Sequence, residues 1–595
     1  MKMFQKVLCL TLALCLIAGL APPLTAEAAQ TDREIVETVK AALSLPAKTS
    51  VDLTLPETGG DGTVILWRSS DESILRADGV LGGADGRVKL TATIFKDSAS
   101  ATRDFFVEVG ALANGLTAFD YGDVQLTAGW FKDLETWHLD DMDSISADAV
   151  LWTFRNCANL YYGQTYNAGS DRFTGWATVG YWNGHMEGHY ISALAQLIGV
   201  YHRQADIDKL NAIIAGLADI QQSMIATEDN GYGQAGSPRP EDFYTEAGYI
   251  SGFPEFHMNK FERDTTGVPT GETKATSSVP WYLLAKVLAG LIDAYRYGGN
   301  EQALDVAKNF GNWVVWRMGR LTEAQRLTIL NTEYGSMGEA LLNLWTLTGD
   351  GAYLTGAGYF EQRAALTDAL ATGIDNLNAK HANTYLAKIA TTAQQYLLTG
   401  DDYYGRAAGN FWEFAVGSGG RAYVNGGVSN AEVFSSAGSL SGTLNARNAE
   451  TCNVYNLLKI SRSLFQATAD VKYLDYYEKA LFNQIAASIA NNGAHVFHSY
   501  FQVLGQNRTG TFLTSVSSNG AQNQSGSSYG TSQYCAWCCN GTGVENFSKL
   551  TEGIYYHDSD KLYVSQYIAS TLSWPEKGLA LTQDTDYPYE DETTF

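Results

Sequence analysis

Four side chains that could hold a metal ion together lie in two short segments of the chain. Glu450 and Cys452 are separated by one residue in "AETCNVYN", and Cys538 and Cys539 are adjacent in "WCCNGTG". Three thiols and one carboxylate supply the four ligands that tetrahedral zinc takes. The two segments therefore form a candidate zinc–thiolate site.

Neither pair of ligands can face one ion from the middle of a helix. Residues two apart are about 200° apart around a helix, so Glu450 and Cys452 would converge only at the entry to the helix expected to begin near Asn453. The adjacent cysteines require a loop, which the glycine-rich stretch 540–543 favours. Both pairs are therefore expected outside helix interiors.

The cysteine count argues against a disulfide framework. Of the 7 cysteines, Cys9 and Cys15 fall in the N-terminal targeting segment, which leaves an odd number. Adjacent cysteines rarely pair, because the ring would strain the peptide between them. Spacing alone leaves three alternatives to a catalytic zinc site: a structural zinc knot, a disulfide between Cys157 and Cys535, or reactive free thiols.

A second candidate is the pair His185 and His189 in "NGHMEGHYIS". These histidines are four residues apart and share one helical face, a spacing that can bind zinc. Glu187 between them does not stand where a His-Glu-x-x-His metalloprotease would have it. The alternative is a pair of hydrogen-bonded histidines that line a cleft.

Composition narrows the class of ligand. The formal net charge is −24, so the surface repels nucleic acid and anionic membranes, which clustered Lys and Arg would attract. A neutral or cationic ligand is easier to accept. The 34 Tyr and 13 Trp suit the stacking of sugar rings, although large helical cores would use them equally well.

The first 29 residues read as a secretory signal peptide. Lys2 and Lys6 precede an apolar run over 7–20, and small residues follow at 26–29. No later stretch reaches the ~20 apolar residues of a membrane span. We therefore expect a secreted, extracellular protein.

Three further regions differ in their periodicity. Residues 30–110 alternate apolar and polar residues after a short helical stretch over 32–45, and resemble bacterial immunoglobulin-like β-sandwich modules. Residues 111–555 show helical periodicity with repeated Gly-Asp joints, which predicts an α-solenoid or a closed α/α toroid without choosing between them. Residues 556–595 read as strands that begin a C-terminal β-sandwich and stop before completing it.

Several motifs, in order, resemble glycoside hydrolase family 127, whose best-known members are β-L-arabinofuranosidases. They are "GHMEGHYISALAQL", "TEYGSMGEALLNLW", "HANTYLAKI", "SGTLNARNAETCNVYNLLKISRSLF" and "YCAWCCNGTGVENFSKLTEGIYYHDSDKLYV", within roughly residues 115–590. The resemblance implies a mainly α fold: an (α/α)6 barrel catalytic domain, here preceded by the immunoglobulin-like module and followed by β-sandwich material.

The resemblance also implies roles for individual residues. Zn²⁺ would be held by Glu450, Cys452, Cys538 and Cys539, with Cys538 also the nucleophile. Glu432 of "AEVF" would be the general acid/base.

The same resemblance implies residues that line the sugar site. They would be His189, His185, His381 and Glu545, although a structural carboxylate is as good an interpretation of Glu545. One position departs from the pattern of many relatives, which carry a histidine where this chain has Ala285. The substrate preference could therefore differ from that of the best-known members.

Together these features predict a secreted retaining glycosidase that releases β-linked L-arabinofuranose or a related sugar from plant glycans or glycoproteins. Alternatives are the same fold acting on another rare pectin-type sugar, or a non-catalytic carbohydrate-binding protein with structural zinc. A polysaccharide lyase is disfavoured, because lyases need basic clusters near uronates and this chain has only 40 Lys and Arg. The immunoglobulin-like module is expected to contact cell wall or glycan.

Overall fold

A computed structural model gives the architecture of the chain. It describes residues 31–43, 45, 48–49, 52–84, 86–109, 115–162, 173–175, 182–224, 247–255, 257–258, 262, 279–331, 335–445, 447–491, 496–502, 504, 535–558 and 560–595. The predicted signal peptide lies outside these residues. The chain divides into two compact units, Met1–Ala111 and Leu112–Phe595, each of which is described separately.

The first unit packs one helix on one sheet. Helix α2 (Asp32–Ala42) begins with a capping box at Thr31 and buries Val36. The described strands form a four-stranded sheet in the order β1-β4-β3-β2, with β1 (Lys48–Thr49), β2 (Val64–Ser69), β3 (Gly86–Lys96) and β4 (Ala99–Val109). Along β3, alternate residues from Val88 to Ile94 are buried, as period-2 sequence requires. This unit therefore has a core of its own.

The second unit is a closed ring of helix pairs. Six inner helices contact one another in sequence, and the last, α18, packs back against the first, α5. The inner helices of the described chain are α5 (His185–Tyr201), α8 (Pro280–Arg296), α11 (Ser336–Thr348), α14 (Ala382–Thr399), α16 (Thr451–Thr468) and α18 (Cys538–Ser548). This closure identifies the helical region as an (α/α)6 barrel rather than an open solenoid.

Outer helices cover the ring. Each inner helix except α18 is followed by an outer one, and α18 packs on α3 from the start of the unit. The outer helices are α3 (Gly129–Ser144), α6 (Gln204–Ser223), α9 (Glu301–Gly319), α12 (Gly351–Gly358), α15 (Asp402–Ala415) and α17 (Lys472–Ala480), and α4 (Ala147–Tyr162) packs on α6. The short helices α10 (Glu323–Leu330) and α13 (Asp368–Ala371) lie in the connections that lead to α11 and α14. Because the chain returns along an outer helix between consecutive inner helices, the inner helices enter the ring from the same end.

The joints between paired helices use the residues that the sequence repeats. Gly349 and Gly400 end α11 and α14 in the left-handed conformation, at φ 69° and 68°. Asp350 and Asp401 then accept a backbone N–H of the next helix as N-caps. In the third copy, Ala469 takes the left-handed position at φ 56°. In the repeated "LTGD" motif, the glycine thus ends one helix and the aspartate caps the N-terminus of the next.

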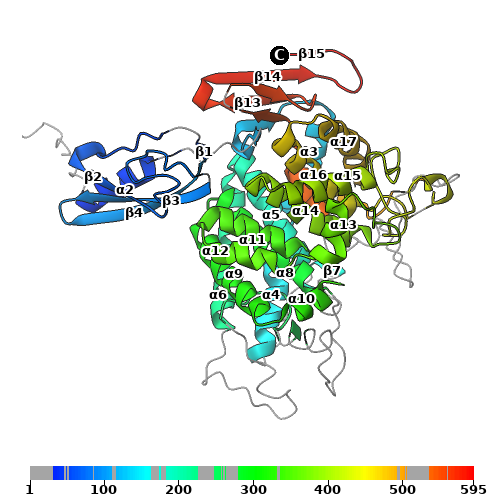
Figure 1. The fold of residues 1–595 in the computed structure, drawn as a ribbon, viewed down its shortest axis with the longest axis horizontal. Helices are drawn as coiled ribbons and strands as arrows, with labels where there is room; N and C mark the ends of the chain where they lie inside the picture. The colour runs from blue at the N-terminus through cyan, green and yellow to red at the C-terminus, as the bar shows by residue number, and fades with distance from the viewer. Residues whose placement is uncertain are drawn as a thin grey trace, which may run out of the picture. The chain divides into compact units, whose positions relative to one another are not determined.

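Strands from both ends of the second unit pair with one another. Short strands β5 (Thr117–Ala118) and β6 (Val124–Leu126) precede the ring. They join two antiparallel sheets, in the orders β12-β11-β5 and β15-β14-β13-β6, formed with β11 (Tyr555–His557), β12 (Leu562–Val564), β13 (Ser570–Trp574), β14 (Leu579–Thr585) and β15 (Thr593–Thr594). Figure 1 shows β13 and β14 beyond the end of the ring where α3 and α17 lie. The segment after the ring is therefore strand-rich, as its sequence predicts.

Candidate active site

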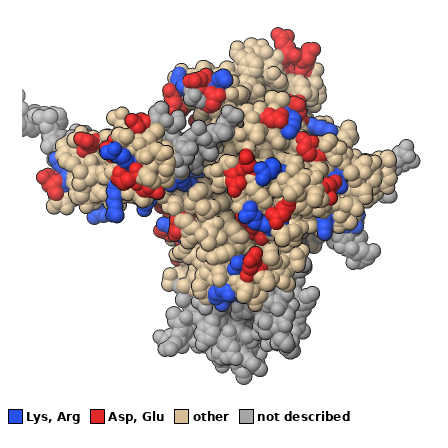
Figure 2. Space-filling view, viewed as in Figure 1, with Lys and Arg blue, Asp and Glu red and all other residues tan. Residues whose placement is uncertain are grey.

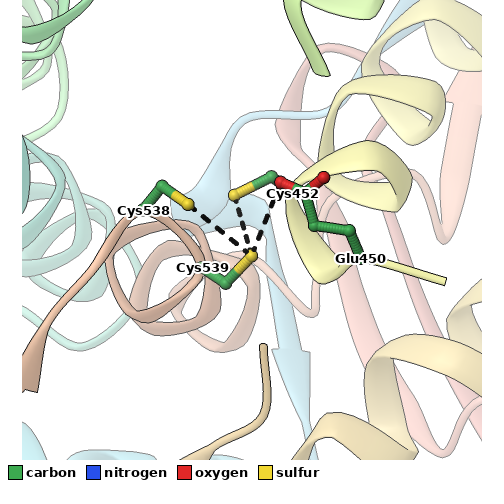
Figure 3. Close-up of side chains that lie close together, drawn as sticks. All are labelled: Glu450, Cys452, Cys538 and Cys539. Atoms are coloured by element: carbon green, nitrogen blue, oxygen red, sulfur yellow. Dashed lines mark hydrogen bonds between the residues drawn. The ribbon is translucent and has the colours of Figure 1, made fainter. Parts of the chain in front are cut away.

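Glu450, Cys452, Cys538 and Cys539 meet in one buried cluster (Figure 3). The Sγ atoms of Cys452 and Cys539 are 3.1 Å apart, and those of Cys538 and Cys539 are 4.0 Å apart. Oε1 of Glu450 lies 3.9 Å from the Cys539 sulfur. One ligand atom of each residue lies within 4.8 Å of the others. The structure thus brings together the four residues that the sequence singles out as ligands.

The start of helix α16 positions the first pair. Glu450 is its N-cap residue, with φ −56° and ψ 131°, and Cys452 is the second residue of the helix. Because Glu450 is not helical, it is not held about 200° away from Cys452 around the helix axis. Both side chains can therefore face one ion, as the sequence analysis expects at the entry to this helix. Cys452 also lies 3.3 Å from the hydroxyl of Thr542 on α18.

The prediction of a loop at the second pair is wrong. Helix α18 begins at Cys538 and runs through the glycine-rich stretch, so both cysteines lie in its first turn. The glycines serve close packing instead: a Cβ at Gly541 would stand 2.6 Å from Cδ2 of His189, and a Cβ at Gly543 2.8 Å from Cβ of His498. Adjacent helical residues can both face the cluster here because it lies at the helix end.

Burial and the charges within the cluster shift the pKa values of Glu450 and the three cysteines. Burial, reinforced by the Cys538 thiolate, raises the pKa of Glu450 well above its usual range. Burial likewise raises the pKa of the Cys452 and Cys539 thiols. Burial would also raise the pKa of Cys538, but hydrogen bonds from Cys452, Cys539 and Tyr500 lower it well below the ordinary value. Cys538 is therefore the thiol held most readily as thiolate.

The donor set fits a metal ion. All four side chains are buried, and Cys452, Cys538 and Cys539 are free thiols. Among the residues described, Oε2 of Glu450 has no hydrogen-bond partner. A buried carboxylate oxygen without a partner is costly unless a cation or proton satisfies it. Soft sulfur ligands with one carboxylate suit a thiophilic divalent ion such as zinc.

A hydrogen-bonded chain links the cysteine cluster to Glu432. The Tyr500 hydroxyl lies 3.1 Å from Sγ of Cys538 and donates to Oε1 of Glu432 at 2.8 Å. Nε2 of His381 lies 3.5 Å from Oε2 of the same carboxylate. Tyr500, which the sequence analysis did not select, therefore links Cys538 to Glu432, and His381 contacts the same carboxylate.

The backbone around Glu432 is held in an uncommon conformation. Glu432 has φ 71°, and Ala431 before it has φ 47°, values that side-chain-bearing residues seldom adopt. The Glu432 carbonyl accepts the N–H of Ala382 at 2.8 Å, and Ala431 donates to the Arg447 carbonyl at 2.7 Å. These bonds tie the loop to the first residue of α14 and to the segment that precedes α16. The strained backbone is thereby held with the Glu432 carboxylate directed at Tyr500.

Exposure changes from one end of this chain to the other. The side chains of Glu432 and His381 are 29% and 37% exposed, whereas Cys538 is 4% exposed. Burial would raise the pKa of Glu432, but hydrogen bonds from His381 and Tyr500, with the charges of His381 and Arg447, lower it. Solvent thus reaches the carboxylate first and the thiol last.

His185, His189 and Glu545 lie in a separate buried network between α5 and α18. Burial and the charge of Lys286 lower the pKa of His189 to about 4, so its neutral ring donates Nδ1–H to Oε2 of Glu545 at 2.5 Å. Oε1 of Glu545 accepts from Tyr455 at 2.8 Å and from Lys549 at 3.1 Å. Because both histidines are at most 1% exposed, their role in sugar binding stays a prediction.

Three polar residues that the sequence analysis did not select, Tyr282, Asn383 and Asn456, extend this network to neighbouring inner helices. Nε2 of His185 lies 3.0 Å from the Tyr282 hydroxyl, and Asn383 accepts from Asn456 at 2.8 Å. With the bond from Asn383 to the Tyr282 hydroxyl at 3.5 Å, these contacts link the N-terminal ends of α5, α8 and α14 to the second turn of α16. Ala285 lies on α8 and is 1% exposed. The residues of this network lie far apart in the sequence, so only the fold brings them into contact.

Charges are mixed over the face drawn in Figure 2, where Lys and Arg side chains lie among Asp and Glu side chains. In the part of the chain that the structure describes, we find no helix of the length and apolarity that a membrane crossing takes.

The closed (α/α)6 barrel thus places the Glu432 carboxylate next to Tyr500, whose hydroxyl also contacts the Cys538 sulfur. A family model described as "Beta-L-arabinofuranosidase, GH127 catalytic domain" matches residues 123–552. The chain therefore belongs to the GH127 family and is a glycosidase. A second model, the atrophied bacterial Ig domain, matches residues 29–112.

Solved structures of the family share the fold. A GH127 β-L-arabinofuranosidase from Geobacillus stearothermophilus T6 superposes with a TM-score of 0.53 at 17% identity, covering 78% of this chain and 71% of that one. A GH127 β-arabinofuranosidase superposes with a TM-score of 0.51 at 15% identity, covering 81% and 69%. No curated protein sequence matches this chain.

Proposed function

We propose that this glycosidase hydrolyses β-L-arabinofuranosides of plant glycans or glycoproteins with retention of configuration, and that it acts outside the cell. Cys538 is the proposed nucleophile and Glu432 the proposed general acid/base. The observation that carries the proposal is the link Cys538–Tyr500–Glu432, with separations of 3.1 Å and 2.8 Å. Retaining hydrolysis needs a nucleophile and a proton donor close together on the same substrate.

In the first step, the Cys538 thiolate attacks the anomeric carbon as the bond to the leaving oxygen breaks. Glu432 in its acid form gives its proton to that oxygen, so the departing group leaves as a neutral alcohol. A carbon–sulfur bond now joins the sugar to Cys538. The lowered pKa of the Cys538 thiol supports the presence of the thiolate that this step needs.

In the second step, the Glu432 carboxylate takes a proton from water as the water attacks the anomeric carbon. The carbon–sulfur bond breaks, the thiolate of Cys538 returns, and Glu432 holds the proton for the next cycle. Two inversions restore the original configuration. Glu432 is the more exposed of the two groups, which supports its contact with incoming water.

The proposed ligands of zinc are Glu450, Cys452, Cys538 and Cys539. Bound zinc would keep its sulfur ligands deprotonated and protect them from oxidation to disulfides. The buried Glu450 oxygen without a described partner supports an ion at this position. Catalysis by the chain's own residues consists of holding Cys538 against Tyr500 and aiming Glu432 at the leaving oxygen.

The family supports L-arabinofuranose as the sugar, because the matching model and the similar solved structures carry arabinofuranosidase names. The support for this particular sugar is weaker at Ala285, where many relatives carry a histidine. A small apolar side chain cannot offer the hydrogen bond that a histidine would. The substrate test therefore includes p-nitrophenyl glycosides of other rare pectin-type sugars beside the β-L-arabinofuranoside. An N-terminal segment with the charge and apolar pattern of a signal peptide supports export.

Replacing the proposed nucleophile tests the mechanism. Cys538→Ala should abolish turnover of p-nitrophenyl β-L-arabinofuranoside, while Cys157→Ala, a buried free cysteine outside the cluster, should leave it unchanged. Denaturing mass spectrometry after rapid quenching should find one sugar unit on the peptide that contains Cys538. Full activity of the Cys538→Ala protein would overturn the nucleophile, and sugar binding without turnover in the parent chain would favour a binding protein.

The acid role of Glu432 has a separate test. Glu432→Gln should slow substrates with poor leaving groups more than p-nitrophenyl substrates, since only the former need a proton in the first step. Equal losses for both kinds of leaving group would contradict the assignment.

A further inference from the structure

His138, Asp141 and His498 form a second cluster of metal-ligating side chains, outside the cysteine site. His138 and Asp141 are three residues apart on α3 and so share a face of that helix. His498 ends the short strand β9 (Val496–His498). Ligand atoms of the three residues lie within 4.8 Å of one another, with Nε2 of His498 3.8 Å from Oδ2 of Asp141. Three donors thus converge from two distant segments.

The two histidines are buried without the partners that buried imidazoles need. Both are 0% exposed. Within the described ranges, neither ring nitrogen of His138 and neither ring nitrogen of His498 has a hydrogen-bond partner. A buried polar group that makes no hydrogen bond is costly, and native proteins contain few of them. A ligand that accepts lone pairs from both rings would remove this cost.

Aromatic packing holds the two rings in place. Their centroids are 6.4 Å apart at an interplanar angle of 80°. The ring of Phe547 on α18 contacts both, at 6.2 Å from His138 and 5.6 Å from His498. The rings are therefore fixed with respect to α3, β9 and α18 before any ion binds.

We propose that His138, Asp141 and His498 bind a divalent transition-metal ion, independently of the cysteine cluster. Two imidazole nitrogens and a carboxylate oxygen form a ligand set that suits zinc and its neighbours rather than calcium or magnesium. Zinc–nitrogen distances of 2.0–2.1 Å place two ligands at most about 4.2 Å apart, so small side-chain rotations close the observed arrangement. The side chain of Asp141 is 10% exposed, which allows water to complete the coordination.

An ion there would join α3 to the segment that leads into the active site. His498 pairs with Ile489 of β8 (Ile489–Asn491). Tyr500 follows two residues later and accepts the N–H of Thr451 through its carbonyl at 2.9 Å. The second ion therefore has a structural role: it anchors β9 and the chain that positions Tyr500 beside Cys538.

Metal content of the intact protein tests the proposal. After zinc loading and dialysis, the parent chain should hold two ions, one in each cluster, and His138→Phe should hold one. His557→Gln, which changes a histidine outside both clusters, should retain two. Cobalt loading separates the sites, because only the cysteine cluster gives a thiolate-to-cobalt charge-transfer band. His138→Phe should keep that band and lose one cobalt.

Thermal unfolding gives a second readout that does not depend on activity. His138→Phe keeps an aromatic ring beside Phe547 but removes both nitrogens. If the site binds an ion, added zinc should raise the unfolding midpoint of the parent by more than that of His138→Phe. The proposal is overturned if both proteins hold the same number of ions, or if His138→Phe is at least as stable as the zinc-loaded parent.

These outcomes are distinguishable from failure of the proposed function. Full activity of Cys538→Ala, with two ions still held by the parent, overturns the proposed nucleophile and leaves the second site standing. A parent protein that is active and holds a single ion, with its thiolate band, overturns the second site alone.

Discussion

Tyr500 is the residue through which the cysteine cluster and the carboxylate communicate. Its hydroxyl contacts a sulfur on one side and a carboxylate on the other. Burial and the surrounding negative charges of Cys538, Glu450 and Cys539 raise the pKa of Tyr500 well above its usual range. The phenol therefore keeps its single proton and donates it to the Glu432 carboxylate, while its oxygen faces the Cys538 sulfur.

Tyr500→Phe should lower kcat by about 10- to 100-fold. A hydrogen bond to a charged group contributes about 1.5–3 kcal/mol, and about 1.4 kcal/mol is a factor of ten. Steady-state kinetics on p-nitrophenyl β-L-arabinofuranoside measures the loss. Tyr353→Phe removes a hydroxyl that bonds Asn312 outside the site, and it should leave kcat unchanged. Equal kcat values for the two variants would contradict a role for Tyr500.

His381→Asn should move the alkaline limb of the kcat/KM profile to higher pH. His381 lowers the pKa of Glu432 by hydrogen bonding and charge, and the first step needs Glu432 protonated. Removing the imidazole raises that pKa, so the acid form persists to higher pH. Asparagine can still cap α14 as His381 does. A shift of the limb therefore reports the pKa of Glu432 and not a loss of helix stability. An unmoved limb, or one moved to lower pH, would rule out the interaction.

The site residues differ in how far the sequence reveals them. The four proposed metal ligands form two pairs that are close in sequence, Glu450 with Cys452 and Cys538 with Cys539. Metal binding can therefore be predicted from the residue types before the fold is known. Tyr500 lies 38 residues from Cys538 and 68 from Glu432, and tyrosine is common in this chain. Only the fold brings these three together, and no spacing rule could select Tyr500 in advance.

At the level of elements, the ends of the inner helices organise the site. Cys538 begins α18, Glu450 caps α16 and His381 caps α14. The partial positive charge of a helix N-terminus stabilises thiolates and carboxylates placed there. The loop expected at 540–543 was wrong because glycine was interpreted as a chain break. Its purpose here is the close approach of α18 to the histidines on α5 and β9.

The helix joints allow a paired test of backbone strain. Gly400→Ala introduces a side chain at φ 68° with no atom within 4 Å of its Cβ. It should therefore lower the free energy of unfolding by about 1 kcal/mol through conformation alone. Ala469→Gly, at φ 56° in the third joint, should leave that free energy unchanged or raise it by up to about 1 kcal/mol. Urea unfolding measures both, and a stabilising Gly400→Ala would refute this account of the joints.

At the scale of the whole molecule, ring closure is what the sequence could not determine. Helical periodicity and the repeated joints predict each hairpin, but an open solenoid and a closed toroid share both. The choice depends on the contact between α18 and α5, which are more than three hundred residues apart. Close packing there needs Gly541 against His189, a pairing visible only in the folded chain.

The two compact units should unfold as separate cooperative bodies. Every buried residue of the first unit's core lies between Val36 and Val109, and the cores of the second unit use none of them. Leu90→Ala removes a side chain that is 0% exposed in β3, which typically costs about 2–5 kcal/mol. Calorimetry should show one transition shifted down by this variant, with kcat and metal content unchanged.

Leu457→Ala is the matched variant in the second unit, since Leu457 is also 0% exposed and lies on α16. It should lower the other transition and, because α16 carries Glu450 and Cys452, it should lower the retained metal and the activity as well. Comparing Leu90→Ala with Leu457→Ala distinguishes a unit that folds independently of the active site from a unit whose stability the active site depends on. If Leu90→Ala instead moved both transitions or reduced kcat, the immunoglobulin-like unit would be part of the enzyme's folding core.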